Sequence, residues 1–111
     1  MQRKIDTVLN QFVEEINKML GRRIKKIILY GSYARGDYNK NSDIDIMILV
    51  DMTDKEIDEY KEKIWNLAYD IELERNIVIS PLIRNIDKYE KRVNIIPFYI
   101  NIQKEGVVLH G

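Results

Sequence analysis

The sequence predicts an α/β fold in which a small mixed β-sheet has helices packed on one side. Two long segments, 3–20 and 54–74, carry apolar residues at helical spacing. Two short segments, 24–30 and 43–50, are apolar runs of strand length. Elements that alternate in this way along a chain build a layered α/β structure. With 111 residues, the chain is expected to form one domain over residues 1–111.

The first expected helix runs from about Arg3 to Leu20. Its apolar residues recur at steps of three and four, and its other face is polar. The apolar stripe comprises Ile5, Val8, Leu9, Phe12, Val13, Ile16, Met19 and Leu20. Gly21 stands where a residue of left-handed conformation would end this helix.

Two strands and a loop follow. The first strand spans 24–30, and its continuous apolar centre is typical of a strand covered on both faces. Ser32 is expected to cap a short helical turn that Gly36 ends. The polar loop 37–42 leads to the second strand, 43–50, which places its alternate apolar residues on one face.

The second half of the chain begins with a long helix to about Glu74, for which Thr53 or Asp54 is the expected cap. A third strand is predicted over 77–83, and Pro81 within it favours an edge position or a bulge. Short helices are predicted over 87–93 and 97–104, the latter opened by a proline. Residues 107–109 suit either a closing strand or a tail that binds a partner.

The acidic residues Asp43 and Asp45 open the second strand. Residues two apart in a strand project to the same face, so these carboxylates point together while Ile44 is buried opposite. Two carboxylates so close repel each other when both are ionised. A divalent cation relieves the repulsion, and oxygen ligands of this kind suit Mg²⁺ or Mn²⁺. Asp43 and Asp45 are therefore candidate metal ligands and catalytic residues.

Gly31 and Ser32 lie at the end of the first strand, and ten residues separate Ser32 from Asp43. A glycine lets the backbone approach a phosphate closely, and the serine hydroxyl adds a donor. Arg35 suits either a phosphate contact or an ion pair with Asp37. A Gly-Ser turn alone, or a solvated Asp-x-Asp at a strand end alone, would be ordinary. Both together at this spacing indicate a nucleotide site in which Gly31, Ser32 and Arg35 bind the phosphates.

These two motifs, read as Gly-Ser-Tyr-Ala-Arg-Gly over 31–36 and Ser-Asp-Ile-Asp-Ile over 42–46, resemble the signature of the DNA polymerase β-type nucleotidyltransferase superfamily. More narrowly, the chain resembles the minimal nucleotidyltransferase (MNT) proteins, which have about this length. The resemblance covers nearly the whole chain, including the segment 100–107. It implies the nucleotidyltransferase fold.

The resemblance also implies an activity. Members transfer a nucleoside monophosphate from a nucleoside triphosphate, usually ATP, to an acceptor hydroxyl, with the metals on Asp43 and Asp45. MNT proteins are antitoxins paired with HEPN-domain toxins, and in some systems they adenylylate a tyrosine of that ribonuclease. The alternatives are an antitoxin that neutralises its toxin by binding, and a small-molecule nucleotidyltransferase of the aminoglycoside-modifying kind.

One departure from the superfamily concerns the third expected strand. The superfamily usually places a third carboxylate there, but residues 76–83 contain no acid. Losing a general base or metal ligand of this kind costs about 10²–10⁴-fold in rate. The sequence thus predicts the fold and a nucleotide–metal site, with either slow transfer or neutralisation of the partner mainly by binding.

Composition excludes several other classes of protein. The chain has no cysteine and a single histidine, His110, so thiolate and His-rich metal sites are excluded. Lysines plus arginines equal the acidic residues at 18 each, which disfavours a nucleic-acid polymer as partner. No apolar segment approaches the ~20 residues that span a bilayer, so a cytoplasmic location is expected. Homo- or hetero-oligomers remain open.

Overall fold

The computed structural model describes residues 3–111 and forms a four-stranded mixed sheet with helices on both faces. The elements in chain order are α1 (Arg3–Leu20), a 3₁₀ turn (Gly21–Arg23), β1 (Ile24–Tyr30), α2 (Ser32–Arg35), β2 (Ile44–Val50), α3 (Asp54–Arg75), β3 (Ile79–Asn85), α4 (Ile86–Arg92), α5 (Pro97–Glu105) and β4 (Val107–His110). The strand order is β3-β2-β1-β4. β1 runs antiparallel to β2 and β4, whereas β2 and β3 are parallel.

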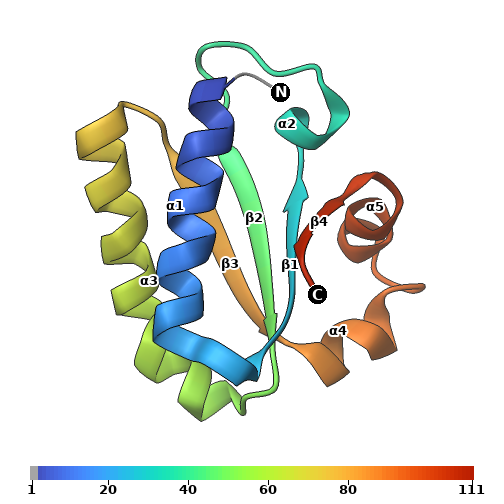
Figure 1. Ribbon diagram of the computed structural model, residues 1–111. Coiled ribbons are helices and arrows are strands. Elements are labelled where there is room, and N and C mark those ends of the chain that lie inside the picture. Colours follow the sequence, from blue (N-terminus) through green and yellow to red (C-terminus); the bar gives the residue numbers. More distant parts are fainter. Residues whose placement is uncertain (1–2) are drawn as a thin grey trace.

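The two long helices, α1 and α3, cover one face of the sheet (Figure 1). Apolar residues of both helices share one core with alternate residues of the strands. Its fully buried side chains include Phe12 and Ile16 of α1, Ile27 and Leu29 of β1, and Ile44, Ile46 and Ile48 of β2. The predicted helical stripe and the predicted face of the second strand are both confirmed.

The short helices α4 and α5 cover the other face of the sheet (Figure 1), whereas the predicted fold class placed helices on one side only. The reason lies in β1 and β2, whose remaining residues are also apolar. Ile28, Met47 and Leu49 point to this second face, and Tyr89 of α4 and Ile102 of α5 pack on them. A mixed sheet with an apolar second face must bury that face as well.

The third strand starts two residues later than the sequence indicated, at Ile79 instead of Ile77. Asn76 ends α3 in the left-handed conformation, with φ of 56°, so Ile77 and Val78 serve as the connection. Pro81 lies in an edge strand, as expected, because β3 pairs only with β2. Residues 107–110 form a strand on β1, which decides between the two readings of this segment in favour of a closing strand.

Two of the predicted helix ends are also confirmed. Thr53 caps α3 in a capping box: its side chain accepts from the Glu56 amide, and the Glu56 side chain accepts from the Thr53 amide. Gly21 follows α1 in the left-handed conformation, with φ of 55°. The capping box fixes where α3 begins and hence how it crosses the sheet.

Candidate functional site

The turn between β1 and α2 forms one wall of the site. Gly31 precedes the first helical residue with φ of 75° and ψ of −155°, a conformation open essentially to glycine alone. Its carbonyl accepts hydrogen bonds from the amides of Ala34 and Arg35, each at 3.1 Å. The expectation that Ser32 caps this turn is wrong: Gly31 is the N-cap, Ser32 is the first helical residue, and no side chain caps the turn. The Ser32 hydroxyl is therefore not used in capping.

Gly31 lies directly against the carboxylate of Asp45. A methyl group added to Gly31 would overlap Asp45 Oδ2 and lie 3.2 Å from its Cγ. The strand register explains the approach, because Asp45 pairs with Tyr30, the residue that precedes Gly31. The antiparallel pairing of β1 with β2 thus brings the Gly-Ser turn and the Asp-x-Asp motif to the same place.

The two carboxylates and Ser80 meet at the edge where β2 and β3 begin. Asp43 is exposed and Asp45 is half-buried, while Ile44 between them is fully buried in the core below α1 and α3. Asp45 pairs with Ser80 of the parallel strand β3. The Ser80 hydroxyl donates a hydrogen bond to Asp43 Oδ2 at 3.2 Å. Asp43, Asp45 and Ser80 therefore form one polar cluster.

The environment of Asp45 raises the pKa of its carboxyl above the usual value. Burial is the main cause, and the nearby charge of Asp43 adds to it. The guanidinium of Arg35 acts in the opposite direction. The site therefore holds two carboxylates, one of them partly desolvated. The positive charge of Arg35 offsets only part of the cost of ionising both.

The donor set of this cluster fits a hard divalent cation. Asp43 and Asp45 supply carboxylate oxygens, and oxygen ligands of this kind suit Mg²⁺ or Mn²⁺. Within residues 3–111, no group of three or more His, Cys, Asp or Glu side chains could hold a metal. Such a cation would therefore complete its coordination with water or with substrate oxygens.

A cleft of about 350 Å³ opens beside the cluster. It lies between the β1–α2 turn and α5. Its lining residues are Tyr30, Gly31, Ser32, Arg35, Asp45, Phe98, Asn101, Ile102 and Glu105. Four of the five residues predicted for the site line this cleft, and the fifth, Asp43, adjoins it through the strand that carries Asp45.

Arg35 bridges the two walls of the cleft. Its Nε donates to Asp37 at 3.2 Å, and one of its terminal nitrogens donates to Glu105 of α5 at 3.1 Å. The alternative of an ion pair with Asp37 is thus observed in the structure. Arg35 nevertheless stays 44% exposed and lines the cleft, so a phosphate contact is also open to it.

The sequence did not identify the wall that α5 contributes. Phe98, Asn101 and Glu105 recur at steps of three and four along α5 and line the cleft together. Phe98 packs edge-on against Tyr30, with ring centroids 5.7 Å apart. The spacing was visible in the sequence, but nothing local indicated that β4 folds back on β1 and sets α5 beside the Gly-Ser turn.

The aromatic residues near the motif serve packing. Tyr33 and Tyr38 stack on each other with centroids 4.3 Å apart, and Tyr33 is buried. This stack ties α2 to the polar loop that leads to β2.

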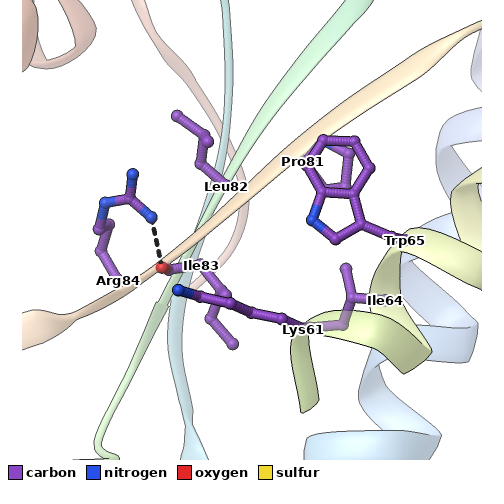
Figure 2. Close-up of a pocket in the computed structure, with 7 residues that line it drawn as sticks. All are labelled: Lys61, Ile64, Trp65, Pro81, Leu82, Ile83 and Arg84. Carbon is purple, nitrogen blue, oxygen red and sulfur yellow. Dashed lines mark hydrogen bonds between the residues drawn. The ribbon is translucent and has the colours of Figure 1, made fainter. Parts of the chain in front are cut away.

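A second groove lies between α3 and the edge strand β3, far along the chain from the Gly-Ser turn. Figure 2 shows the Trp65 ring beside Pro81, with Lys61 and Arg84 near Ile83. The groove has about 220 Å³ and none of the five predicted site residues lines it. Trp65 is 51% exposed and therefore lies outside the core.

Comparison with known protein families agrees with this geometry. Residues 9–108 match the family described as the nucleotidyltransferase domain, which covers most of the chain. "Putative protein adenylyltransferase MJ0604" of Methanocaldococcus jannaschii is 37% identical over 105 residues, covering 95% of this chain and 97% of that protein. "Putative protein adenylyltransferase MJ0141" of the same organism is 40% identical over 106 residues, covering 94% and 97%.

Solved structures share the fold. A chain from the crystal structure of a toxin–antitoxin with AMP-PNP superposes with a TM-score of 0.58 at 20% identity, covering 91% of this chain and 72% of that one. A chain from a mutant of the toxin–antitoxin MntA-HpeT gives a TM-score of 0.57 at 18% identity, with the same coverage.

Among the described residues, none of the helices has the length and hydrophobicity needed to cross a bilayer.

Proposed function

The chain belongs to the nucleotidyltransferase domain family, and from this premise we propose that it transfers AMP from ATP to a tyrosine of a HEPN ribonuclease toxin and thereby acts as the antitoxin. The tyrosine oxygen attacks the α-phosphorus of ATP. The bond from that phosphorus to the bridging oxygen breaks, pyrophosphate leaves, and the phenolic proton passes to water. A toxin partner of this kind implies a cytoplasmic location.

The observation that carries the proposal is the shared cleft of Gly31, Ser32 and Asp45. Gly31 lets the backbone approach a phosphate, and the Ser32 hydroxyl and Arg35 add donors to the same wall. Asp45 stands against Gly31, so phosphates bound there would lie next to the carboxylate cluster. Donors for phosphate beside ligands for Mg²⁺ are the arrangement that nucleotide transfer requires.

Asp43 and Asp45 would hold Mg²⁺ or Mn²⁺, which neutralises charge that develops on the transferred phosphoryl group. The chain's own residues supply the rest: Gly31 and Ser32 orient the triphosphate, and Arg35 offers a second positive charge. The volume of the cleft, about 350 Å³, is within the range of small-molecule sites. The α5 wall, with Phe98 and Asn101, is left for the nucleoside or the acceptor.

The nature of the acceptor is inferred from relatives. Curated relatives that match nearly end to end carry the name of protein adenylyltransferases, and the fold neighbours come from toxin–antitoxin structures, one of them with AMP-PNP. These support a protein acceptor in a toxin–antitoxin pair and ATP as donor. The HEPN identity of the toxin and the tyrosine target rest on the resemblance of the sequence motifs to MNT proteins.

A second candidate is an antitoxin that neutralises its toxin by binding alone. Ser80 favours it, because this hydroxyl stands on β3 beside Asp45, on the strand where the superfamily usually supplies a third carboxylate. A small-molecule nucleotidyltransferase is a third candidate, since Phe98 and Asn101 of the α5 wall are left to contact an acceptor. The three candidates differ in the acceptor of AMP, which is a tyrosine of the toxin for the first, absent for the second and a small molecule for the third.

The test uses the protein encoded by the adjacent gene, expected to be a small all-helical protein with an Arg-x₄-His motif. The two proteins are incubated with Mg²⁺ and ATP labelled at the α-phosphate. The proposal predicts label on a tyrosine of the partner, located by mass spectrometry, and no label with the double variant Asp43→Asn/Asp45→Asn. Label at the wild-type rate in that variant would overturn the roles of these carboxylates.

The same double variant separates the first two candidates in cells. If it no longer protects cells from the toxin but still co-purifies with it, transfer is the mechanism of neutralisation. If it protects as well as the wild type, binding is sufficient. Transfer of label to an aminoglycoside, with none to the partner protein, would favour the third candidate.

A further inference from the structure

Ser80 is the one residue of the polar cluster that the proposed reaction leaves without a role. It lies on β3 in register with Asp45, and its hydroxyl donates to Asp43 Oδ2 at 3.2 Å. The two residues are 37 positions apart in the chain, so the bond links the starts of two neighbouring strands. Ser80 is half-buried whereas Asp43 is exposed.

An exposed carboxylate at a strand end rotates freely unless another group holds it. The bond from Ser80 occupies one oxygen of Asp43. Among residues 4–111, no other side chain donates a hydrogen bond to Asp43. Partners that fix the orientation of a metal-binding carboxylate are as much a part of a metal site as the ligands themselves.

The side chains of β3 alternate between the two faces of the sheet, and this alternation decides which face Ser80 is on. Ile79 and Ile83 belong to the core below α1 and α3, whereas Ser80 points to the face that carries Asp45. Leu82, the next residue on that face, packs in the second core. Ser80 is thus the only residue of β3 that lies beside the two carboxylates on the same face of the sheet.

We propose that Ser80 is a positioning residue that orients the Asp43 carboxylate for binding a divalent cation. This inference rests on the proposed function, because it assumes that Asp43 and Asp45 hold the cation. It differs from that proposal in assigning a role to an uncharged side chain on a third segment of the chain. The site then has two negative charges, a fixed geometry and no third acid.

The test measures Mn²⁺ binding to the whole protein by electron paramagnetic resonance, first alone and then with AMP-PNP. Ser80→Ala removes the hydroxyl, and Ser80→Thr keeps it in a side chain well suited to a strand. Ser42→Ala is the matched control: it removes a serine hydroxyl directly before Asp43, one that accepts a hydrogen bond from the Asn39 amide instead. Thermal unfolding of each variant reports on the fold.

We expect Ser80→Ala to weaken Mn²⁺ binding by about 10-fold or more while the melting temperature stays close to that of the wild type. Ser80→Thr and Ser42→Ala should bind Mn²⁺ as the wild type does. Wild-type affinity in Ser80→Ala overturns the role of Ser80 and leaves the proposed function intact. A wild-type protein that binds no Mn²⁺, even with AMP-PNP, overturns both.

Discussion

Gly31 and Asp45 are in contact: the Cα of Gly31 lies so close to the Asp45 carboxylate that no side chain fits between them. This contact joins two motifs that are separated by ten residues in the sequence. It depends on the register of β1 against β2, in which Tyr30 is paired with Asp45. The Gly-Ser turn and the carboxylates are therefore positioned by the sheet itself.

The contact predicts the effect of Gly31→Ala. The new methyl group would displace Asp45, and the residue would keep a backbone conformation that costs non-glycine residues about 1–3 kcal/mol. We expect a lower free energy of unfolding by urea and a loss of nucleotide binding. Gly36→Ala is the control, because Gly36 also has a positive φ, 85°, but open space around it.

Gly36→Ala should lose stability through backbone strain alone and keep its affinity for Mg²⁺ and AMP-PNP. If both variants lose affinity equally, the collision with Asp45 is not what matters, and general destabilisation of the turn explains the loss.

The raised pKa of Asp45 predicts a dependence of stability on pH. A carboxyl whose pKa is raised by burial and by Asp43 binds its proton more tightly in the folded state than in the unfolded state. Ionised Asp45 therefore opposes folding. This penalty is absent below the ordinary aspartate pKa of about 3.9 and develops as the pH rises through the raised value.

Asp45→Asn should accordingly have a higher melting temperature than the wild type at neutral pH, and the difference should shrink on acidification. Asp70→Asn on the exposed surface of α3 changes the net charge equally and serves as the control. A lower melting temperature for Asp45→Asn at neutral pH, or a difference that does not depend on pH, would contradict the conclusion that ionised Asp45 opposes folding.

The ion pair between Arg35 and Glu105 predicts that α5 competes with the substrate phosphates for the guanidinium of Arg35. Glu105 holds Arg35 across the cleft, and its negative charge faces the place proposed for phosphates. Glu105→Gln should therefore bind Mg²⁺ and AMP-PNP a few-fold more tightly in isothermal titration, whereas Arg35→Ala should bind more weakly.

Asp37→Asn is the matched control, since Asp37 is the other partner of Arg35 but does not line the cleft. It should change the affinity less than Glu105→Gln does. If Glu105→Gln weakens binding as Arg35→Ala does, Glu105 supports the site instead of competing with phosphate.

Local patterns in the sequence were sufficient for the elements and for half of the site. The helical spacing of 3–20 and the capping signal at Thr53 or Asp54 both depend on neighbours in the chain; the spacing is confirmed, and the structure makes Thr53 the cap. Asp43 and Asp45 share a face because strands alternate, and the Gly-Ser turn follows from a glycine at the end of a strand. Each of these features involves residues a few positions apart.

Long-range features could not be read in this way. Glu105 meets Arg35 across 70 positions, and Ser80 meets Asp43 across 37. Both contacts depend on strand order and register, which no short pattern specifies. The predicted start of β3 is wrong by two residues for a related reason. Ile77 and Val78 have side chains typical of a strand, but they follow the left-handed Asn76 and form the connection between α3 and β3.

The measurement that tests the central claim most directly is the affinity for AMP-PNP by isothermal titration, with and without Mg²⁺, for the wild type and for Asp43→Asn/Asp45→Asn. The account predicts that the wild type binds the analogue with Mg²⁺, and that removal of either the metal or the two carboxylates weakens binding by about 10-fold or more. Equal affinity in all of these states would contradict a nucleotide–metal site at Gly31, Asp43 and Asp45.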